Sequence, residues 1–292
     1  MDKCTLKAMA KINLGLDVIR RRADGYHEVR MIMQTIDLYD ELTFERLPEN
    51  ELRMTANLRM LPTDRNNLII RTAELLREEF GIREGLAVHL KKNIPVAAGM
   101  AGGSTDAAAV FVAMNRMFGL GLGMEELQKR AVRIGADVPY CIQGGTALSE
   151  GIGEILTALP PAPRCSVVVA KPGIHVSTKF VYQNLRLDRL PGHPDIDGMI
   201  ESIRAGSLKG VAGRLENVLE TVTAEEYPVI EQIKGFLMEQ GALGALMSGS
   251  GPTVFGLYGD RREARRACEE LKKAGLAKQV YQASFTNRTC IE

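Results

Sequence analysis

The sequence predicts an α+β fold divided between two domains. Residues 5–18 alternate between apolar and polar side chains, which is typical of a β-strand, and apolar residues recur at helical spacing from residue 68 onward. A proline-rich segment at 159–163 cannot continue a helix or donate to a strand ladder, and helices alternate with strands after it. At 292 residues the chain is long enough for two domains or for one large one. We expect an N-terminal domain at 1–160 and a C-terminal domain at 161–292.

Composition and charge exclude several classes of protein. A net charge of +1 gives no general attraction for nucleic acid or for an anionic membrane. The five cysteines are an odd number without CxxC spacing, and the four histidines are scattered. This pattern argues against a disulfide framework and a zinc site and favours a reducing compartment. The N-terminus lacks the apolar core of a signal peptide, and no apolar stretch reaches membrane-spanning length, so we expect a cytoplasmic location.

The first strand carries two polar residues of interest. If residues 5–18 form a regular strand, the even-numbered residues from Leu6 to Val18 lie on an apolar face. Lys11 and Asn13 then point together from the opposite face. From spacing alone a solvated polar face is the better interpretation, because strand lysines are mostly exposed.

An aromatic pair follows a turn after this strand. Asp24-Gly25 is a turn signal, and it delivers Tyr26 and His27 onto a loop or a strand start. Such a pair can lie on the surface without a role, or it can stack on a ring and hydrogen-bond to the edge of a ligand. The residues alone leave these alternatives open.

Turn residues and apolar spacing predict the other elements. Residues 29–38 and 41–46 are expected to form strands joined at Tyr39-Asp40, and residues 68–80 a helix ended by Gly81. After the proline-rich segment, helices are expected at 195–205, 207–220, 225–240 and 260–274, and strands at 165–170, 244–248, 253–258 and 278–285.

Residues 95–109 (PVAAGMAGGSTDAAA) form a glycine-rich loop that leads into a helix. Glycines let the backbone approach a ligand closely, and the helix start offers unpaired N–H groups and a positive dipole end. A flexible turn before a helix capped by Ser104 or Thr105 would need no ligand. The local chemistry favours a phosphate site over that simpler interpretation.

Two further motifs allow a structural or a functional interpretation. Asp137 stands two residues before Pro139, as in a helix cap, but a carboxylate held there could also accept a proton from a hydroxyl in a cleft. On spacing alone the cap is the better interpretation. The glycine-rich segment at 247–253 could be a hairpin connection, or it could present backbone amides to an anion.

The order of these motifs and the residues in them resemble those of the GHMP small-molecule kinase family, which includes galactokinase, homoserine kinase and mevalonate kinase. The three motifs of that family correspond here to residues 10–16, 95–109 and 246–253. The loop is not a Walker A motif, because no Gly-Lys-[Ser/Thr] occurs in it, and the protein-kinase motifs are absent. One departure is Met100-Ala101, where the family commonly has Leu-Gly.

The resemblance implies a fold, an activity and a cofactor. An N-terminal mixed α/β domain that binds ATP would pack against a C-terminal ferredoxin-like α/β domain, with the active site in the cleft between them. Residues 24–27, 135–139 and 171–173 are most similar to the branch that phosphorylates the 2-hydroxyl of a cytidylylated methylerythritol, in the non-mevalonate pathway to isoprenoid precursors. ATP would carry Mg²⁺ with it, without a dedicated protein metal site.

The resemblance also implies roles for individual residues. Lys11 would be the catalytic lysine, Asp137 would accept the hydroxyl proton, and Asn13 would help to hold the hydroxyl or the phosphate. Tyr26 and Tyr182 would stack on the cytosine, and His27 would read its edge. Val176 and Thr178 would lie nearby. The ATP phosphates would be wrapped by Pro95, Val96, Ala97, Ala98, Gly99, Met100, Ala101, Gly102, Gly103, Ser104 and Thr105, with Ser104 or Thr105 near the metal. The third glycine motif consists of Ser248, Gly249, Ser250 and Gly251.

Two alternatives remain open from the sequence. The chain could be a GHMP kinase for another small alcohol of the homoserine or mevalonate type, or a nucleotide-binding regulator without catalysis. The partners would be ATP and a small-molecule substrate, with no nucleic acid and no membrane, for a monomer or a homodimer.

Overall fold

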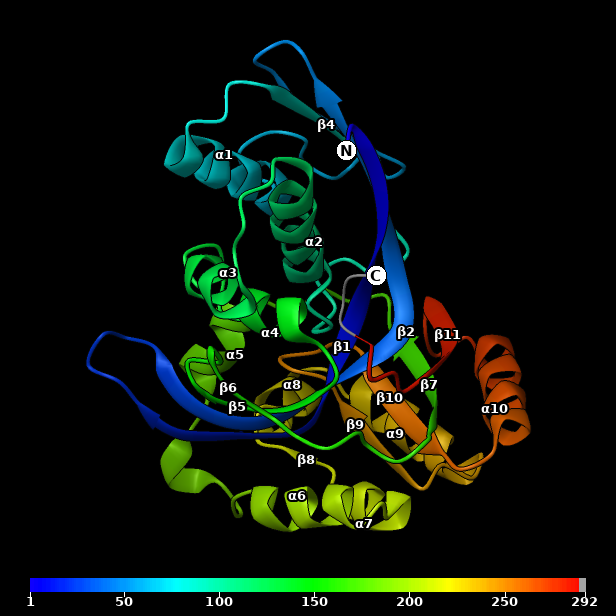
Figure 1. The fold of residues 1–292 in the computed structure, drawn as a ribbon. Coiled ribbons are helices and arrows are strands. Elements are labelled where there is room, and N and C mark those ends of the chain that lie inside the picture. The colour runs from blue at the N-terminus through cyan, green and yellow to red at the C-terminus, as the bar shows by residue number, and fades with distance from the viewer. Residues whose placement is uncertain (289–292) are drawn as a thin grey trace.

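The structure, a computed structural model, describes residues 1–288 and contains two β-sheets with helices packed around them (Figure 1). The larger sheet contains β3 (Leu52–Ala56), β4 (Gly85–Lys91), β2 (His27–Leu47), β1 (Lys3–Arg21) and β8 (Glu216–Asn217) in this spatial order. In addition, β5 (Thr146–Gly151) pairs with β2, and β6 (Ile155–Ala158) pairs with β5. The long antiparallel pair of β1 and β2 forms the spine of this sheet (Figure 1).

The expectation of one continuous apolar face on β1 is wrong. The register of β1 against β2 shifts between Met9 and Lys11 and again between Asn13 and Gly15. The first shift leaves two extra residues on β2, and the second leaves one extra residue on β1. Such irregularities rotate a strand locally, so the alternation of faces restarts. Ala8 and Leu16 therefore pack in the hydrophobic cluster that also contains helix α2, whereas Ala10, Ile12 and Leu14 pack in the apolar layer shared with the second sheet.

The expected break at Tyr39-Asp40 is also wrong, because β2 runs without interruption through both residues. Asp40 is completely buried there. Its carboxylate pairs with the Lys92 ammonium, at a distance of 2.5 Å between Lys92 Nζ and Asp40 Oδ2. A residue that is typical of a turn is thus held inside a strand by a partner that lies far along the chain.

The helices of the first half cover one side of the larger sheet. They are α1 (Leu68–Phe80), α2 (Gly102–Met117), α3 (Met124–Ala131) and α4 (Val138–Gln143). The prediction for α1 is confirmed at both ends: the Asn67 side chain accepts a hydrogen bond from the Ile69 N–H, and Gly81 adopts a φ of 63° after the last turn. Helix α2 packs against β1, α1 and α4 and is buried along most of its length.

The second sheet has the strand order β11 (Gln279–Ser284), β7 (Ser166–Lys171), β10 (Val254–Tyr258) and β9 (Gly244–Met247), and every neighbouring pair is antiparallel. Numbered within this sheet, the order is fourth, first, third, second, which is the ferredoxin-like arrangement. Helices α9 (Val229–Glu239) and α10 (Arg261–Ala274) pack against it. The predicted α+β class and the ferredoxin-like second half are confirmed.

The predicted bounds of two helices in this half are wrong. Residues 207–220 do not form one helix, because α7 (Leu208–Ala212) ends early and β8 follows it. Residues 225–240 are divided at Pro228, between α8 (Glu220–Glu226) and α9. The remaining elements are α5 (Thr178–Asn184), a 3₁₀ turn (Leu187–Arg189) and α6 (Ile196–Arg204).

The two halves share contacts on several elements. The short strand β8 returns to the larger sheet and pairs in parallel with Gly15 and Leu16 of β1. The Arg30 guanidinium of β2 binds the Asp197 carboxylate of α6 through two hydrogen bonds of 2.7 and 2.9 Å. The boundary between residues 160 and 161 stays a prediction, since the chain passes from β6 to β7 there but later rejoins the first sheet at β8.

The cysteines and the length of the helices bear on what the composition led us to expect. Cys4, Cys165 and Cys268 are free thiols, and Cys290 lies outside the described residues. None of the helices formed by residues 1–288 combines the length and the apolar character needed to cross a bilayer.

Candidate active site

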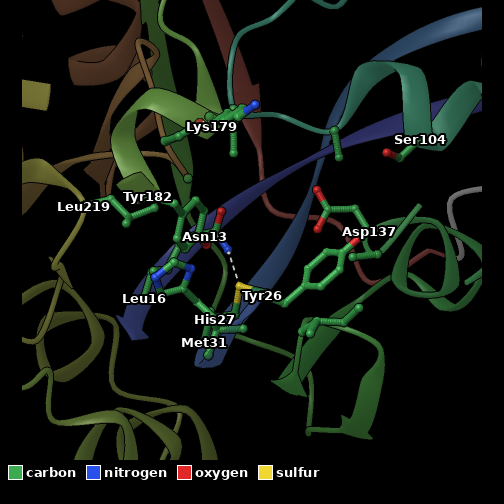
Figure 2. A pocket seen from close by; sticks show the side chains of 18 of the residues that line it. Asn13, Leu16, Tyr26, His27, Met31, Ser104, Asp137, Lys179, Tyr182 and Leu219 are labelled. Carbon is green, nitrogen blue, oxygen red and sulfur yellow. Dashed lines mark hydrogen bonds between the residues drawn. The ribbon is translucent and has the colours of Figure 1, made fainter. Parts of the chain in front are cut away.

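A cavity of about 1110 Å³ opens where β1, the start of β2, the glycine-rich loop, the start of α4 and helix α5 meet (Figure 2). The sequence-predicted site residues that line it are Lys11, Asn13, Tyr26, His27, Ala97, Ala98, Gly99, Ala101, Gly102, Gly103, Ser104, Asp137, Thr178, Tyr182, Gly249 and Ser250. The predicted residues that do not line it are Pro95, Val96, Met100, Thr105, Val176, Ser248 and Gly251. Most of the predicted site is therefore brought together around one space.

Lys11 lies in the wall of this cavity, and the interpretation as a solvated strand lysine is wrong. The residue is only 4% exposed. Its ammonium donates a hydrogen bond of 2.7 Å to Asn13 Oδ1, and Lys11 Nζ lies 3.9 Å from Asp137 Oδ2. The bulges of β1 produce this placement, because they turn Lys11 and Asn13 toward the cavity while the next apolar residues face the second sheet.

Asn13 is fixed by contacts on each of its polar groups. Its amide nitrogen donates to the Met31 sulfur at 3.2 Å (Figure 2). Its backbone N–H donates to Ser248 Oγ at 3.3 Å. With Nδ2 directed to Met31, Oδ1 is directed to Lys11. Asn13 thus links the lysine to the third glycine motif.

Asp137 occupies the N-cap position of α4, but its side chain makes no capping hydrogen bond. The interpretation of its carboxylate as a helix cap is therefore wrong. The carboxylate is directed into the cavity, with 34% of the side chain exposed (Figure 2). A carboxylate placed beside an ammonium at a cavity wall can accept a proton from a bound hydroxyl.

The glycine-rich loop is held in an unusual backbone conformation next to the third glycine motif. Ala97 and Ala101 have φ values of 50° and 55°, which side-chain-bearing residues rarely adopt. Ser248 Oγ donates to the Gly99 carbonyl at 2.9 Å, and the Lys11 N–H donates to the Met100 carbonyl at 3.3 Å. A Cβ at Gly99 would lie 2.1 Å from the Ser248 carbonyl oxygen, so glycine is required there for this close approach.

The third glycine motif forms a hairpin connection, which is one of the two interpretations that the sequence left open, and it also reaches the cavity. The binding of an anion by its backbone amides stays a prediction. The motif connects the antiparallel strands β9 and β10, as a hairpin connection does. It also contributes Gly249 and Ser250 to the cavity, and Ser250 Oγ lies 2.8 Å from Thr178 Oγ1 at the start of α5. This segment therefore joins the loop, Asn13 and α5.

The residues around the start of α2 fit the phosphates of ATP. Gly102, Gly103 and Ser104 form the first turn of a helix of 16 residues and line the cavity, and no side chain caps this end. Uncapped N–H groups and the positive end of a helix dipole are suited to an anion. Of the two residues expected near the metal, Ser104 reaches the cavity, whereas Thr105 is buried and its Oγ1 has no hydrogen-bond partner within residues 1–288.

The aromatic residues lie at the other end of the cavity. The rings of His27 and Tyr182 are in contact, with 5.0 Å between their centroids and a tilt of 34°, and Tyr26 is 59% exposed (Figure 2). Burial lowers the pKa of His27, and the positive charge of Arg21 adds to this effect. A neutral imidazole can both donate and accept a hydrogen bond, which suits the edge of a base. His27, rather than Tyr26, is therefore the ring packed against Tyr182.

Several lining residues were not predicted. Met31, Lys179 and Leu219 line the cavity and come from β2, α5 and the approach to α8. A methionine, a lysine or a leucine carries no motif that would mark it in the sequence. Only the fold brings these three positions to one space.

Comparison with known proteins places the chain in a family. The GHMP kinases N terminal domain model matches residues 67–145, and the GHMP kinases C terminal model matches residues 199–277. A 4-diphosphocytidyl-2-C-methyl-D-erythritol kinase of Lachnoclostridium phytofermentans is 51% identical over 285 residues, which cover 98% of each chain. The chain belongs to the GHMP kinase family. A second relative of this GHMP kinase, the 4-diphosphocytidyl-2-C-methyl-D-erythritol kinase of Lachnospira eligens, is 52% identical over 96% of this chain and 98% of its own.

Solved structures agree with the family assignment. A crystal structure of 4-(cytidine 5'-diphospho)-2C-methyl-D-erythritol kinase is similar to this GHMP kinase with a TM-score of 0.84 and 33% identity, over 98% of this chain and 100% of that one. A homoserine kinase from Cytophaga hutchinsonii has a TM-score of 0.78 at 21% identity, over 100% of this chain and 97% of its own, and supports the fold alone. The predicted family resemblance is confirmed.

Proposed function

We propose that this GHMP kinase transfers the γ-phosphoryl group of ATP to the 2-hydroxyl of 4-diphosphocytidyl-2-C-methyl-D-erythritol. The observation that carries the proposal is the position of Lys11, Asn13 and Asp137 on one cavity that also contains the start of α2 and the His27–Tyr182 ring pair. Relatives that share about half of their residues with this chain are named as kinases of that substrate.

The chemistry follows from the side chains. Phosphoryl transfer depends on positioning and charge neutralisation more than on covalent catalysis. Bound ATP supplies the phosphoryl group, and the Mg²⁺ that accompanies it offsets the charge on the phosphate oxygens. Lys11 would orient the substrate hydroxyl, and Asp137 would accept its proton as the new bond to phosphorus forms. Asn13 would hold Lys11 in place through the hydrogen bond at its Oδ1.

The two ends of the cavity have different proposed ligands. The uncapped N–H groups of Gly102, Gly103 and Ser104 would bind the ATP phosphates. His27 would hydrogen-bond to the cytosine edge, Tyr182 would contact its face, and the exposed ring of Tyr26 would close over it. Val176 and Thr178 would support this end from α5 and the segment before it. The free thiols favour the cytoplasm as the location.

The rivals differ from this proposal in the ligand of the aromatic end. Homoserine and mevalonate have no ring, so an aromatic pair would give them no stacking contact. A regulator without catalysis would not need an ammonium and a carboxylate 3.9 Å apart beside the start of α2. The ring pair therefore favours the cytidylylated substrate, and the charged pair favours catalysis.

Phosphorus NMR of the reaction mixture tests the proposal. With ATP, Mg²⁺ and the cytidylylated substrate, we expect ADP together with one new phosphomonoester signal, while the substrate's diphosphate signals persist. Transfer to another hydroxyl would give a different carbon coupling pattern and would contradict the assigned position. Formation of ADP without any phosphorylated alcohol would indicate hydrolysis and would exclude the proposed transfer.

A further inference from the structure

Three buried charged side chains lie behind the glycine-rich loop and have no role in the chemistry above. Lys92 follows β4, Asp40 lies in the middle of β2, and Asp106 lies in the first turns of α2. Their exposed fractions are 7%, 0% and 3%. Lys92 Nζ lies 2.5 Å from Asp40 Oδ2 and 2.6 Å from Asp106 Oδ2, so a single ammonium joins both carboxylates.

This charged cluster (Lys92, Asp40 and Asp106) contacts both ends of the loop. Asp40 Oδ1 accepts hydrogen bonds from the backbone N–H groups of Asn93, at 2.6 Å, and Ile94, at 2.8 Å. These residues stand immediately before the loop begins at Pro95. Asp106 lies where the loop has become helix α2. The cluster therefore fixes the position of the loop entry relative to the helix start.

The Lys92 ammonium also lies close to the backbone of the helix start. A Cβ at Gly102 would lie 2.9 Å from Lys92 Nζ and 3.0 Å from Ile94 Cγ2. Gly102 lines the cavity on its other side. The backbone of this residue is thus placed between the cluster and the space that phosphate would occupy.

Stability alone is a weak reason for such a cluster. Removing an ammonium and two carboxyl groups from water costs free energy that their mutual interactions offset only in part, and apolar replacements of similar size are often as stable. The loop, however, contains Ala97 and Ala101 at positive φ, and strained backbone persists only where its surroundings determine it. Because no side chain caps α2, fixing the two loop ends is a way to maintain this conformation.

We propose that Lys92, Asp40 and Asp106 are positioning residues that hold the glycine-rich loop in the conformation that binds the ATP phosphates. This proposal rests on the proposed function, because it takes the loop to be an ATP site. Without the cluster the loop must be ordered by the nucleotide itself, so the affinity for ATP falls. The aromatic end of the cavity does not contact the cluster, and its affinity for the second substrate is retained.

The test compares binding of the two ligands to a double variant, Lys92→Met with Asp106→Leu. Removing Lys92 together with Asp106 avoids an unpaired buried ammonium. The remaining Asp40 carboxylate keeps its two backbone donors, the N–H groups of Asn93 and Ile94. We expect calorimetry to show that a non-hydrolysable ATP analogue with Mg²⁺ binds about tenfold or more weakly, while the cytidylylated substrate binds within about threefold of the original protein. The matched control, Arg130→Met with Glu79→Leu, removes an ion pair between α3 and α1 and should change neither affinity.

Four outcomes are decisive. Unchanged affinity for the ATP analogue in a folded double variant overturns the proposal, and so does an equal loss for both ligands. If the double variant does not fold, Asp106→Asn and Asp106→Leu are compared, because only the asparagine keeps an oxygen acceptor for Lys92; equal affinities in these two variants also overturn it. Failure of the original protein to bind the ATP analogue would instead contradict the proposed function.

Discussion

Lys11 Nζ lies 3.9 Å from Asp137 Oδ2, which joins the long strand β1 of the larger sheet to the start of α4 across one cavity wall. The lysine is buried and bonded to Asn13, whereas the carboxylate is partly open to the cavity. A hydroxyl that enters between them meets a proton donor and a proton acceptor at once. This arrangement accounts for two residues whose local interpretations, as a surface lysine and as a helix cap, are both wrong.

Replacing Asp137 by asparagine tests the proton acceptor. Asp137→Asn keeps the size of the side chain and removes its basicity, so we expect kcat for ADP formation to fall on the order of a hundredfold or more. The KM for ATP should change little, because the carboxylate does not belong to the glycine-rich loop. Asp2→Asn, at a side chain that is 91% exposed, is the matched control. Turnover by Asp137→Asn at the rate of this control would remove Asp137 from the proposed role.

Replacing His27 by phenylalanine tests whether His27 forms hydrogen bonds with the edge of the cytosine base. The variant keeps a ring against Tyr182 but loses both ring nitrogens, so a bound base would lack its hydrogen-bond partner. We expect the KM for the cytidylylated substrate to rise about tenfold or more, with the KM for ATP unchanged. Steady-state kinetics with each substrate varied in turn gives this comparison. An equal rise in both KM values would indicate a general disturbance of the cavity instead.

The strained loop makes a prediction about stability. Ala101 adopts a φ of 55°, which costs an alanine roughly 1–2 kcal/mol, while glycine adds flexibility to the unfolded chain. The two effects oppose each other, so Ala101→Gly should leave the free energy of unfolding unchanged or raise it. Ala108→Gly, inside α2, is the control and should lower it by about 1 kcal/mol or more. Chemical denaturation measures both, and an equal loss in the two variants would contradict the strain at residue 101.

The charged cluster predicts a pH dependence of stability. Burial, and then the neighbouring Asp40, raises the pKa of Asp106 from its ordinary 3.8 to about 8, although Lys92 opposes the shift. Between those values the folded protein holds a proton that the unfolded chain has released, so the stabilisation from Asp106 decreases as pH rises. It is complete below the ordinary value and is lost as the pH passes through about 8.

The comparison of this protein with its Asp106→Asn variant isolates that effect. Lys92 and Asp40 are common to both proteins, and asparagine does not titrate. We expect the difference in free energy of unfolding, original minus variant, to fall by on the order of 1 kcal/mol per pH unit between about pH 5 and 8. Urea denaturation at several pH values gives this difference. A difference that stays constant or increases with pH would contradict the raised pKa.

Elements with local signals could be predicted from the sequence. Helix α1 begins and ends where its cap residues Asn67 and Gly81 indicate, and α2 follows directly after the glycine-rich loop. Lys11, Asn13 and Asp137 were found through the motifs that resemble the GHMP kinases, not through their own spacing. For Lys11 and Asp137, spacing alone favoured the wrong interpretation.

Features that depend on distant partners could not be predicted. The bulges of β1 follow from its pairing with β2, and they decide which residues of β1 face the cavity. Aspartate is common in turns, so the sequence places a turn at Asp40. Only its ion pair with Lys92, 52 residues further along the chain, explains why Asp40 is buried in a strand. Likewise, the contact between His27 and Tyr182 depends on how α5 packs over the start of β2. No local pattern contains this information.

The measurement that tests the central claim most directly is ADP formation by the purified protein with three alcohols in turn: 4-diphosphocytidyl-2-C-methyl-D-erythritol, homoserine and mevalonate. The account predicts turnover of the cytidylylated alcohol with a kcat/KM at least about a hundredfold above that of the other two, because only this substrate has a base for His27 and Tyr182 to contact. Turnover of homoserine or mevalonate without turnover of the cytidylylated alcohol would contradict it.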